Sequence, residues 1–189
     1  VRRAGKRFGS AVPFVAMNSF ATAEATLHHV RDHSGFGARP DDLLSFEQTI
    51  AVRLTERGEL FVQDDGSASY YAPGHGDFFP CIRHSGVLKT LRARGVRHVL
   101  FSNVDNLGAV LDPVVLGHHL RLGTAMSVEV TEKRKNAEGK WDKGGAPAVV
   151  DGERMIVEGF RFPADFRQEQ LPDFSTNTMY FSTEALDQD

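Results

Sequence analysis

The run Pro73-Gly74-His75-Gly76-Asp77 is the first stretch in which residue type and spacing could support chemistry. Two glycines around a histidine let the backbone approach a ligand closely, because no Cβ stands in the way. His75 could then donate a hydrogen bond, or offer a positive charge, to a phosphate or a sugar hydroxyl. The other interpretation is a surface turn with a solvated histidine, because short Gly-His-Gly strings have little specificity.

A second candidate is the polar run Ser102-Asn103-Val104-Asp105-Asn106, which directly follows an apolar, β-branched segment. An aspartate at the carboxyl end of a buried strand suits Mg²⁺ held beside a phosphate. This ion favours one or two carboxylates, and waters and phosphate oxygens complete its octahedron. The alternative is that Asp105 caps a helix, since Asp and Asn are favoured N-cap residues.

Gln48 and the run Lys143-Gly144-Gly145 give weaker signals. A glutamine amide can pair with the donor and acceptor edge of a pyrimidine base, although a solvent-facing glutamine is the default. Lys143 and the open backbone after it could place an ammonium and amide groups near an anion. A flexible hairpin turn explains the same run equally simply.

Several common catalytic signatures are missing from the sequence. It has no Walker A loop, no Gly-x-Gly-x-x-Gly, no zinc spacing of Cys and His, and no Gly-x-Ser-x-Gly nucleophile elbow. The lone cysteine, Cys81, cannot form an internal disulfide, which fits a reducing cytoplasm and favours a small packing residue over a nucleophile.

The elements that must position these residues follow from the hydrophobic pattern. We expect strands over residues 12–18 and 96–101, and helices over 23–33, with Thr22 as N-cap, and 85–94, with Gly95 as the stop. A further helix should carry Leu111 to His119. Extended segments are expected at 125–130, 148–150, 155–162 and 178–181, with a charged, Gly-rich loop over 132–145. Alternation of strands and helices predicts an open α/β sheet, in which ligands bind outside the carboxyl ends of the strands.

Composition bounds the class of protein. The 189 residues are 41% hydrophobic, enough for one compact domain with a real core, and no low-complexity linker divides them. A formal net charge of -3 gives no argument for nucleic acid or an anionic membrane as partner. No apolar run approaches the roughly 18 residues that would span a bilayer.

Seven strings in order resemble the eukaryotic-type UDP-glucose pyrophosphorylase family. They lie within residues 13–181, and each is weak alone, but their order makes the resemblance specific. The strings are Pro13-Phe14-Val15-Ala16-Met17-Asn18-Ser19-Phe20, Phe46-Glu47-Gln48, Pro73-Gly74-His75-Gly76-Asp77, Phe101-Ser102-Asn103-Val104-Asp105-Asn106-Leu107-Gly108-Ala109, Val128-Glu129-Val130-Thr131-Glu132-Lys133, Lys143-Gly144-Gly145 and Ser175-Thr176-Asn177-Thr178.

The resemblance implies a Rossmann-like, GT-A-like nucleotidyltransferase domain, with a mixed, mainly parallel sheet flanked by helices. It implies Mg²⁺ as cofactor and UTP, glucose-1-phosphate, UDP-glucose and pyrophosphate as reaction partners; it leaves the oligomeric state open. It also implies roles for single residues. Gln48 and Gly74 would contact uracil or its ribose; His75, Asn103, Val104 and Asp105 would face the glucosyl and phosphate groups, with Asp105 also ligating Mg²⁺; Glu129, Gly145 and Asn177 would line the sugar pocket.

Departures from the family pattern keep alternatives open. The family's Gly-rich loop and its following lysine would lie upstream of these residues, so residues 1–189 are expected to be the central portion of the catalytic domain, incomplete at both ends. Alone they should bind UTP weakly and turn over nothing measurable. Val52 and Thr178 replace the usual proline and asparagine, and residues 133–143 form a longer segment than usual. The alternatives are a uridylyltransferase for another sugar-1-phosphate, such as N-acetylglucosamine-1-phosphate, and a non-catalytic relative that keeps the fold.

Overall fold

The computed structural model describes residues 2–142 and 144–188, and these residues form two compact units. The first unit runs up to Val96 and includes the short segment that starts at Leu186. The second unit is Arg97–Ala185. The chain therefore leaves the first unit once and returns to it at its C-terminal end.

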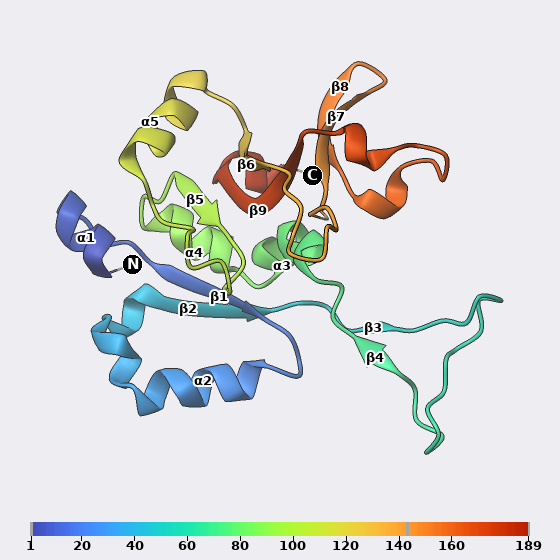
Figure 1. Cartoon of the computed structure of the whole chain (residues 1–189). Coiled ribbons are helices and arrows are strands. Elements are labelled where there is room, and N and C mark those ends of the chain that lie inside the picture. The colour runs from blue at the N-terminus through green and yellow to red at the C-terminus, as the bar shows by residue number, and fades with distance from the viewer. Residues whose placement is uncertain (1, 143, 189) are drawn as a thin grey trace. The chain divides into compact units, whose positions relative to one another are not determined.

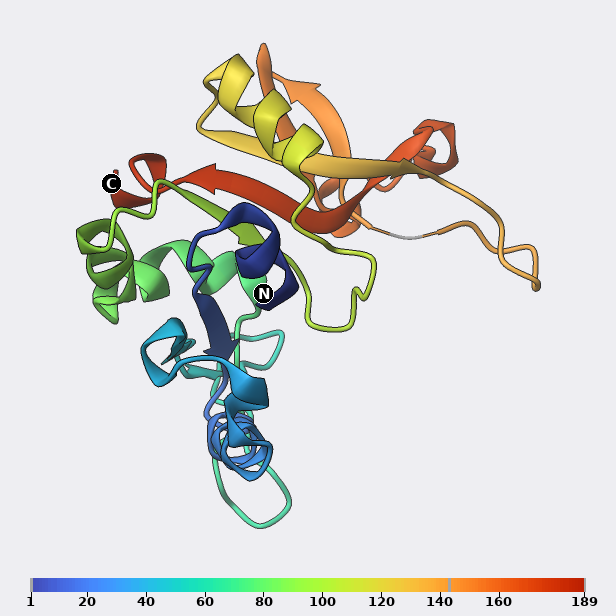
Figure 2. The same ribbon diagram turned by 90° about the vertical axis from the view of Figure 1, so that its left-hand side faces the viewer.

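A parallel strand pair organises the first unit. Its helices and strands are α1 (Arg2–Phe8), β1 (Phe14–Asn18), α2 (Ala23–Asp32), β2 (Leu43–Glu47), β3 (Ala51–Val52), β4 (Tyr70–Tyr71), α3 (Phe78–His84) and α4 (Val87–Ala93). β1 and β2 are parallel, with Asn18 opposite Glu47. Figures 1 and 2 show α2 on one side of this pair and α3 and α4 on the other. Gln48 is the first residue after β2, and its N–H donates to the Asn18 carbonyl at the end of β1, at 2.9 Å.

The core of the first unit lies where α3 and α4 meet β2. Its buried apolar side chains come from these three elements and from the C-terminal segment: Phe46, Phe78, Cys81, Ile82, Val87, Leu88, Leu91 and Leu186. The sequence did not predict α3, because the preceding Pro- and Gly-rich run reads as a loop. Pro80 is tolerated there because it lies in the first turn of the helix, where a backbone N–H has no partner within the helix.

Antiparallel pairing organises the second unit. Its helix and strands are β5 (His98–Phe101), α5 (Pro113–Leu122), β6 (Met126–Glu132), β7 (Ala146–Val150), β8 (Glu153–Val157) and β9 (Asp173–Ser182). β9 lies between β5 and β6 and is antiparallel to both, and β7 pairs with β8. The β6–β9 register shifts between Val128 and Val130, an irregularity of the kind that re-aims side chains. Glu129 sits at this shift.

The α/β class is confirmed, but the expected mainly parallel pairing is wrong. Among the described strand pairs, β1–β2 is parallel, and β3–β4, β5–β9, β6–β9 and β7–β8 are antiparallel, because β9 runs between β5 and β6 in the opposite direction to both. The strand expected over 155–162 ends at Val157, and Gly159–Arg161 form a 3₁₀ turn. Thr22 occupies the N-cap position of α2 as expected, but its Oγ1 accepts from the Ser19 N–H at 2.9 Å and from no helical N–H.

Two extended hairpins project from the units. Between β3 and β4 the chain forms an arm, closed by the bridges Leu54↔Leu60 and Val62↔Ala68, that extends away from the rest of the first unit (Figure 1). Between β6 and β7 a bridge joins Lys135 to Trp141, and the Lys135 ammonium lies 5.0 Å from the centre of the indole ring. This hairpin occupies the segment expected to be a charged loop.

Candidate functional site

Gln48 and Gly74 are brought together in the first unit. The Gly74 N–H donates to Gln48 Oε1 at 2.7 Å, across 26 residues of sequence. Gly74 has φ 89° and ψ -157°, a backbone conformation that side chains disfavour. Because the Gly74 amide fixes the oxygen of Gln48, the Gln48 NH₂ group keeps its two donors for another partner.

Asp77 lies three residues after Gly74 and also reaches back to the segment that follows β2. Its Oδ2 accepts from the Thr49 N–H at 2.6 Å, from Thr49 Oγ1 at 2.8 Å and from Cys81 Sγ at 3.0 Å. Burial alone would raise the pKa of the Asp77 carboxyl, but the bonds from Cys81 and Thr49 outweigh it and lower that pKa. Burial raises the pKa of the Cys81 thiol, which fits the expected packing role. His75 is exposed in the 3₁₀ turn between Gly74 and Asp77.

Asn103 and Asn177 are brought together in the second unit. Asn103 follows β5, Asn177 lies in β9, and the Asn177 Nδ2 donates to Asn103 Oδ1 at 2.6 Å. Asn177 has φ 58°, a left-handed conformation that asparagine tolerates better than most residues. A second hydrogen bond joins the same two segments: Asn106 Nδ2 donates to Thr178 Oγ1 at 3.2 Å. The loop after β5 is therefore tied to β9 at two points.

Glu129 and Gly145 border the same stretch of β9. Thr176 Oγ1 donates to Glu129 Oε1 at 2.9 Å, and the Ser175 N–H donates to the Gly145 carbonyl at 2.7 Å. A Cβ on Gly145 would lie 2.8 Å from Ile156 Cγ2, so a larger residue would force the β7–β8 hairpin to move. The second unit thus gathers Asn103, Glu129, Gly145 and Asn177 along residues 175–177.

Asp105 and Val104 lie in the exposed turn after Asn103. Val104 is 94% exposed, and within the described part of the chain no group donates to the Asp105 carboxylate. The described residues contain no group of three or more His, Cys, Asp or Glu side chains able to hold a metal. The donor set fits a hard ion such as Mg²⁺ only if one carboxylate is completed by waters and substrate oxygens, which is this ion's usual arrangement. Asp105 caps no helix: that role falls to Asp112, whose Oδ1 accepts from Val114 N–H at 2.7 Å.

Lys143 lies outside the described residues, so its predicted role stays a prediction. Its neighbours Gly144 and Gly145 are described and lead into β7. The sequence missed Thr49, Asp77 and Thr176 as partners of the predicted residues. The sequence singled out Asp77 only as the last residue of the 73–77 run, and nothing in the sequence signals that a residue 28 positions away would bind it.

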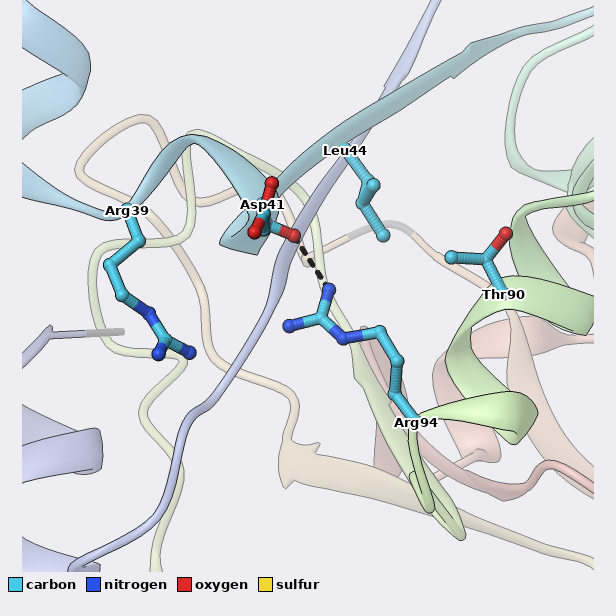
Figure 3. Close-up of a pocket in the computed structure, with 5 residues that line it drawn as sticks. All are labelled: Arg39, Asp41, Leu44, Thr90 and Arg94. Atoms are coloured by element: carbon cyan, nitrogen blue, oxygen red, sulfur yellow. Dashed lines mark hydrogen bonds between the residues drawn. The ribbon is translucent and has the colours of Figure 1, made fainter.

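The first unit also has a hollow of about 390 Å³, lined by Arg39, Asp41, Leu44, Thr90 and Arg94 (Figure 3). Its two guanidinium groups are already engaged. Arg39 Nε donates to Asp42 Oδ2 at 2.8 Å, Arg94 pairs with Asp42 as well, and Arg94 Nη1 donates to the Asp41 carbonyl at 2.6 Å. The two arginines hold the pKa of Asp42 below its usual range. Two cations against two aspartates leave no net charge for an anion, and no predicted site residue lines the hollow.

A chain of polar side chains centred on a buried histidine runs through the second unit. His119 of α5 is 1% exposed; its Nε2 lies 3.2 Å from His98 Nδ1 on β5, and its Nδ1 lies 2.8 Å from Ser127 Oγ on β6. Burial lowers the pKa of both histidines, and for His98 the neighbouring His119 and Arg97 lower it further. Burial also raises the pKa of Tyr180, whose ring packs on His119. These groups contact one another across four elements, and none belongs to the predicted site.

Comparison with known proteins places this arrangement in a family. The family model described as UTP–glucose-1-phosphate uridylyltransferase matches residues 1–188. Proteins of that name from Saccharomyces cerevisiae and Hordeum vulgare are 32% and 30% identical, and each match covers 96% of this chain. The chain spans 36% and 38% of the length of these two relatives. No helix among the described residues is long and apolar enough to cross a membrane.

Solved structures give the same fold. A crystal structure of UDP-glucose phosphorylase from Trypanosoma brucei superposes with a TM-score of 0.82 at 25% identity, and the match covers 98% of this chain and 41% of that one. The uridine diphosphate N-acetylglucosamine pyrophosphorylase of the same organism, solved with an inhibitor, gives 0.78 at 21% identity, over 98% of this chain and 39% of that one. With a family model that matches nearly every residue, the chain belongs to the UTP–glucose-1-phosphate uridylyltransferase family.

Proposed function

We propose that these residues are part of an enzyme that joins UTP and glucose-1-phosphate to give UDP-glucose and pyrophosphate. The observation that carries the proposal is the Gly74-to-Gln48 hydrogen bond within a chain that the family model matches over residues 1–188. Because this bond occupies the Gln48 oxygen, the NH₂ group of Gln48 would face the ligand, and its two donors would suit the carbonyl oxygens of a uracil ring. The His75 ring, one residue on, is exposed and can meet the sugar-phosphate part of the nucleotide.

The sugar side of the reaction falls to the second unit under this proposal. The side chains of Asn103, Glu129 and Asn177 offer amide and carboxylate groups along one stretch of β9, as a sugar with several hydroxyls requires. Gly145 lets the backbone pack closely against Ile156 and Glu158 beside them, because a Cβ there would meet both side chains. Val104 would supply an apolar contact next to these polar groups.

The chemistry needs charge neutralisation more than acid–base catalysis. A phosphate oxygen of glucose-1-phosphate would attack the α-phosphorus of UTP in line, the bond from that phosphorus to the bridging oxygen would break, and pyrophosphate would leave with its electron pair. Both reactants are anionic, so positioning and electrostatic stabilisation supply most of the rate. Asp105 would hold Mg²⁺, whose role when bound is to neutralise phosphate charge. Asp105 thus needs no proton of its own.

The test is a pyrophosphate-release assay with UTP and a panel of sugar-1-phosphates, carried out on the full-length polypeptide that contains these residues. Asp105→Asn should lower kcat by about 100-fold or more and raise the Mg²⁺ concentration needed for half-maximal rate, because the variant keeps the shape but loses the charge. The matched control is Asp165→Asn, an exposed carboxylate of the same unit that plays no part in the proposal.

Three results would contradict parts of the proposal. An Asp105→Asn enzyme with the wild-type rate and magnesium dependence would remove Asp105 from the metal site. A preference for N-acetylglucosamine-1-phosphate would replace glucose by the sugar named for one of the structural neighbours. No release with any sugar phosphate would favour a non-catalytic relative.

A further inference from the structure

Asp77 makes the second of two connections between the loop after β2 and the turn before α3. The first joins Gln48 Oε1 to the Gly74 N–H, and the second joins Asp77 Oδ2 to both donors of Thr49. Gln48 and Thr49 are adjacent in the chain, and Gly74 and Asp77 are three residues apart. The two segments are therefore held at two successive points, 26 and 28 residues apart in sequence.

A role in helix capping does not explain Asp77. It occupies the N-cap position of α3, but its side chain accepts no hydrogen bond from the first turn of backbone N–H groups, and its backbone is in the αR region. The carboxylate instead points back to Thr49, and the single helical group that reaches it is the Cys81 thiol, at 3.0 Å. An aspartate at this position normally stabilises the helix through its side chain. Here the hydrogen bonds of the Asp77 carboxylate join the turn before α3 to the loop after β2 instead.

The link matters because the turn it holds adopts a conformation open only to glycine and is secured by few bonds of its own. Gly74 has φ 89° and ψ -157°, and His75 to Asp77 form a single 3₁₀ turn, so few backbone bonds secure this segment. If the Gln48 amide alone held the turn, the residue that meets the ligand would also have to supply all of the positioning. The Asp77 carboxylate is charged, so its hydrogen bonds from the N–H and the hydroxyl of Thr49 are stronger than a bond to the neutral amide of Gln48.

We propose that Asp77 is a positioning residue for the nucleotide, which acts by clamping Thr49 and thereby fixing the Gln48–Gly74 pair in its binding geometry. This inference rests on the proposed function, because it assumes that the Gln48–Gly74 pair receives the uridine of UTP. It adds two residues, Thr49 and Asp77, whose effect on UTP is transmitted through the pair they hold.

The test measures KM for UTP and for glucose-1-phosphate separately in the full-length polypeptide. Asp77→Ala should raise KM for UTP by about tenfold or more, because part of the binding free energy of UTP is then used to order the turn. KM for the sugar phosphate should change by less than about threefold. Thr49→Val should act in the same direction, and Thr49→Ser, which keeps the hydroxyl, should restore the wild-type KM for UTP. In the double variant the two effects should not add, because the hydroxyl bond lost in Thr49→Val is among the bonds already lost in Asp77→Ala.

The matched control is Asp65→Ala in the arm between β3 and β4. Asp65 Oδ1 accepts from the Ser67 N–H at 2.9 Å and from Ser67 Oγ at 2.6 Å, the same pair of donor types that Asp77 receives from Thr49. Its loss should leave both KM values alone. Circular dichroism and thermal unfolding of each variant would separate a clamp from a general loss of folding.

The outcomes distinguish the inference from the proposed function. If the wild type transfers uridylyl groups and Asp77→Ala leaves KM for UTP unchanged, or raises both KM values equally, the clamp is overturned. If the wild type shows no transfer, the proposed function fails, and calorimetric titration with UTP then tests the clamp alone. In that titration, Asp77→Ala binding UTP as tightly as wild type overturns it, and a tenfold loss that Thr49→Val reproduces supports it.

Discussion

At Gly74 the backbone adopts φ 89° and ψ -157°, and nothing lies within 4 Å of where a Cβ would stand. The requirement for glycine there comes from torsion, not from crowding. Gly76, two residues later, also faces open space, but its φ lies outside the positive range. Gly74 and Gly76 therefore differ in whether φ is positive. The same substitution at each position separates the effect of backbone torsion from the effect of crowding.

Gly74→Ala should cost about 1–3 kcal/mol of stability, because a side chain at this torsion is strained. It should also weaken UTP binding by about tenfold, since the strained turn would withdraw the N–H from Gln48. Gly76→Ala should change stability by less than about 1 kcal/mol, in either direction. Urea unfolding and UTP titration of both variants check this. Equal costs at the two positions would show that crowding or a ligand contact, not torsion, selects glycine.

At this scale the sequence predicted the residues better than their partners. Gln48, Gly74, Asn103 and Asn177 were all predicted, and the structure bonds them in two pairs. Their assigned roles remain predictions. Thr49 and Thr176 could not be predicted, because a hydroxyl's partner depends on register and turn geometry that no local pattern encodes. The shift at Glu129 and the left-handed Asn177 are such features.

Among the elements, α5 is joined to two strands by polar contacts in a buried place. His119 on the helix meets His98 on β5 and Ser127 on β6, and the pKa of each histidine is lowered chiefly by burial. The folded state therefore favours the neutral rings. In the unfolded chain both rings take up protons near their ordinary pKa of 6.5.

Acidification should loosen this packing before it affects the carboxylates. Since the unfolded state binds more protons, the free energy of unfolding should be at its full value above pH 6.5 and fall below it, by up to about 1.4 kcal/mol per pH unit for each histidine. The fall should stop below the lowered folded pKa values. The depressed pKa values of Asp42, Asp65 and Asp77 act in a separate window, starting below about 3.8.

Urea unfolding between pH 7.5 and 5 measures the histidine effect. His119→Gln should flatten part of the dependence, whereas His28→Gln, at a side chain 63% exposed, should leave it unchanged. An unaltered slope in His119→Gln would mean that other groups carry the protons. Burial raises the pKa of Tyr180, whose ring packs on His119, so this group stays neutral across that range.

Elements with a strong hydrophobic period were predicted close to their observed bounds. β1, α2, α4 and β5 are of this kind. α3 was missed because its short run, FFPCIRH, contains a proline and its apolar residues gain their meaning only from packing on β2 and α4. β9 was predicted only at its C-terminal half, since its first half holds polar residues that pair with β6 and line the predicted sugar pocket.

On the scale of the whole molecule, the chain returns to the first unit with its last described residues. Leu186 is 1% exposed, and the residues after it pair with the helices of that unit: Asp187 with Arg92 of α4, and the Gln188 carbonyl with Arg83 of α3. A segment some 90 residues away in sequence thus completes the core that α3 and α4 build. No local sequence pattern predicts that residues 186–188 contact α3 and α4, because these contacts join residues far apart in the sequence.

Leu186→Ala should therefore destabilise the first unit by about 3 kcal/mol, the usual loss when a buried leucine leaves a cavity. Hydrogen exchange should show the change in the amides of α3 and α4. Leu54→Ala in the arm, at a side chain 59% exposed, should cost less than about 1 kcal/mol. Unchanged protection of α3 and α4 in the Leu186 variant would remove this segment from the core of the first unit.

The Lys135–Trp141 hairpin has a practical consequence, because the sequence contains a single tryptophan. The near-ultraviolet emission of the protein therefore comes chiefly from the Trp141 ring, which is 41% exposed. In the chain, Trp141 and Asp142 precede the glycines before β7. A cation 5.0 Å from its centre makes that emission sensitive to small movements of the hairpin. The molecule thus carries its own optical probe on the hairpin between β6 and β7, and a nucleotide sugar can be titrated against it without any attached dye.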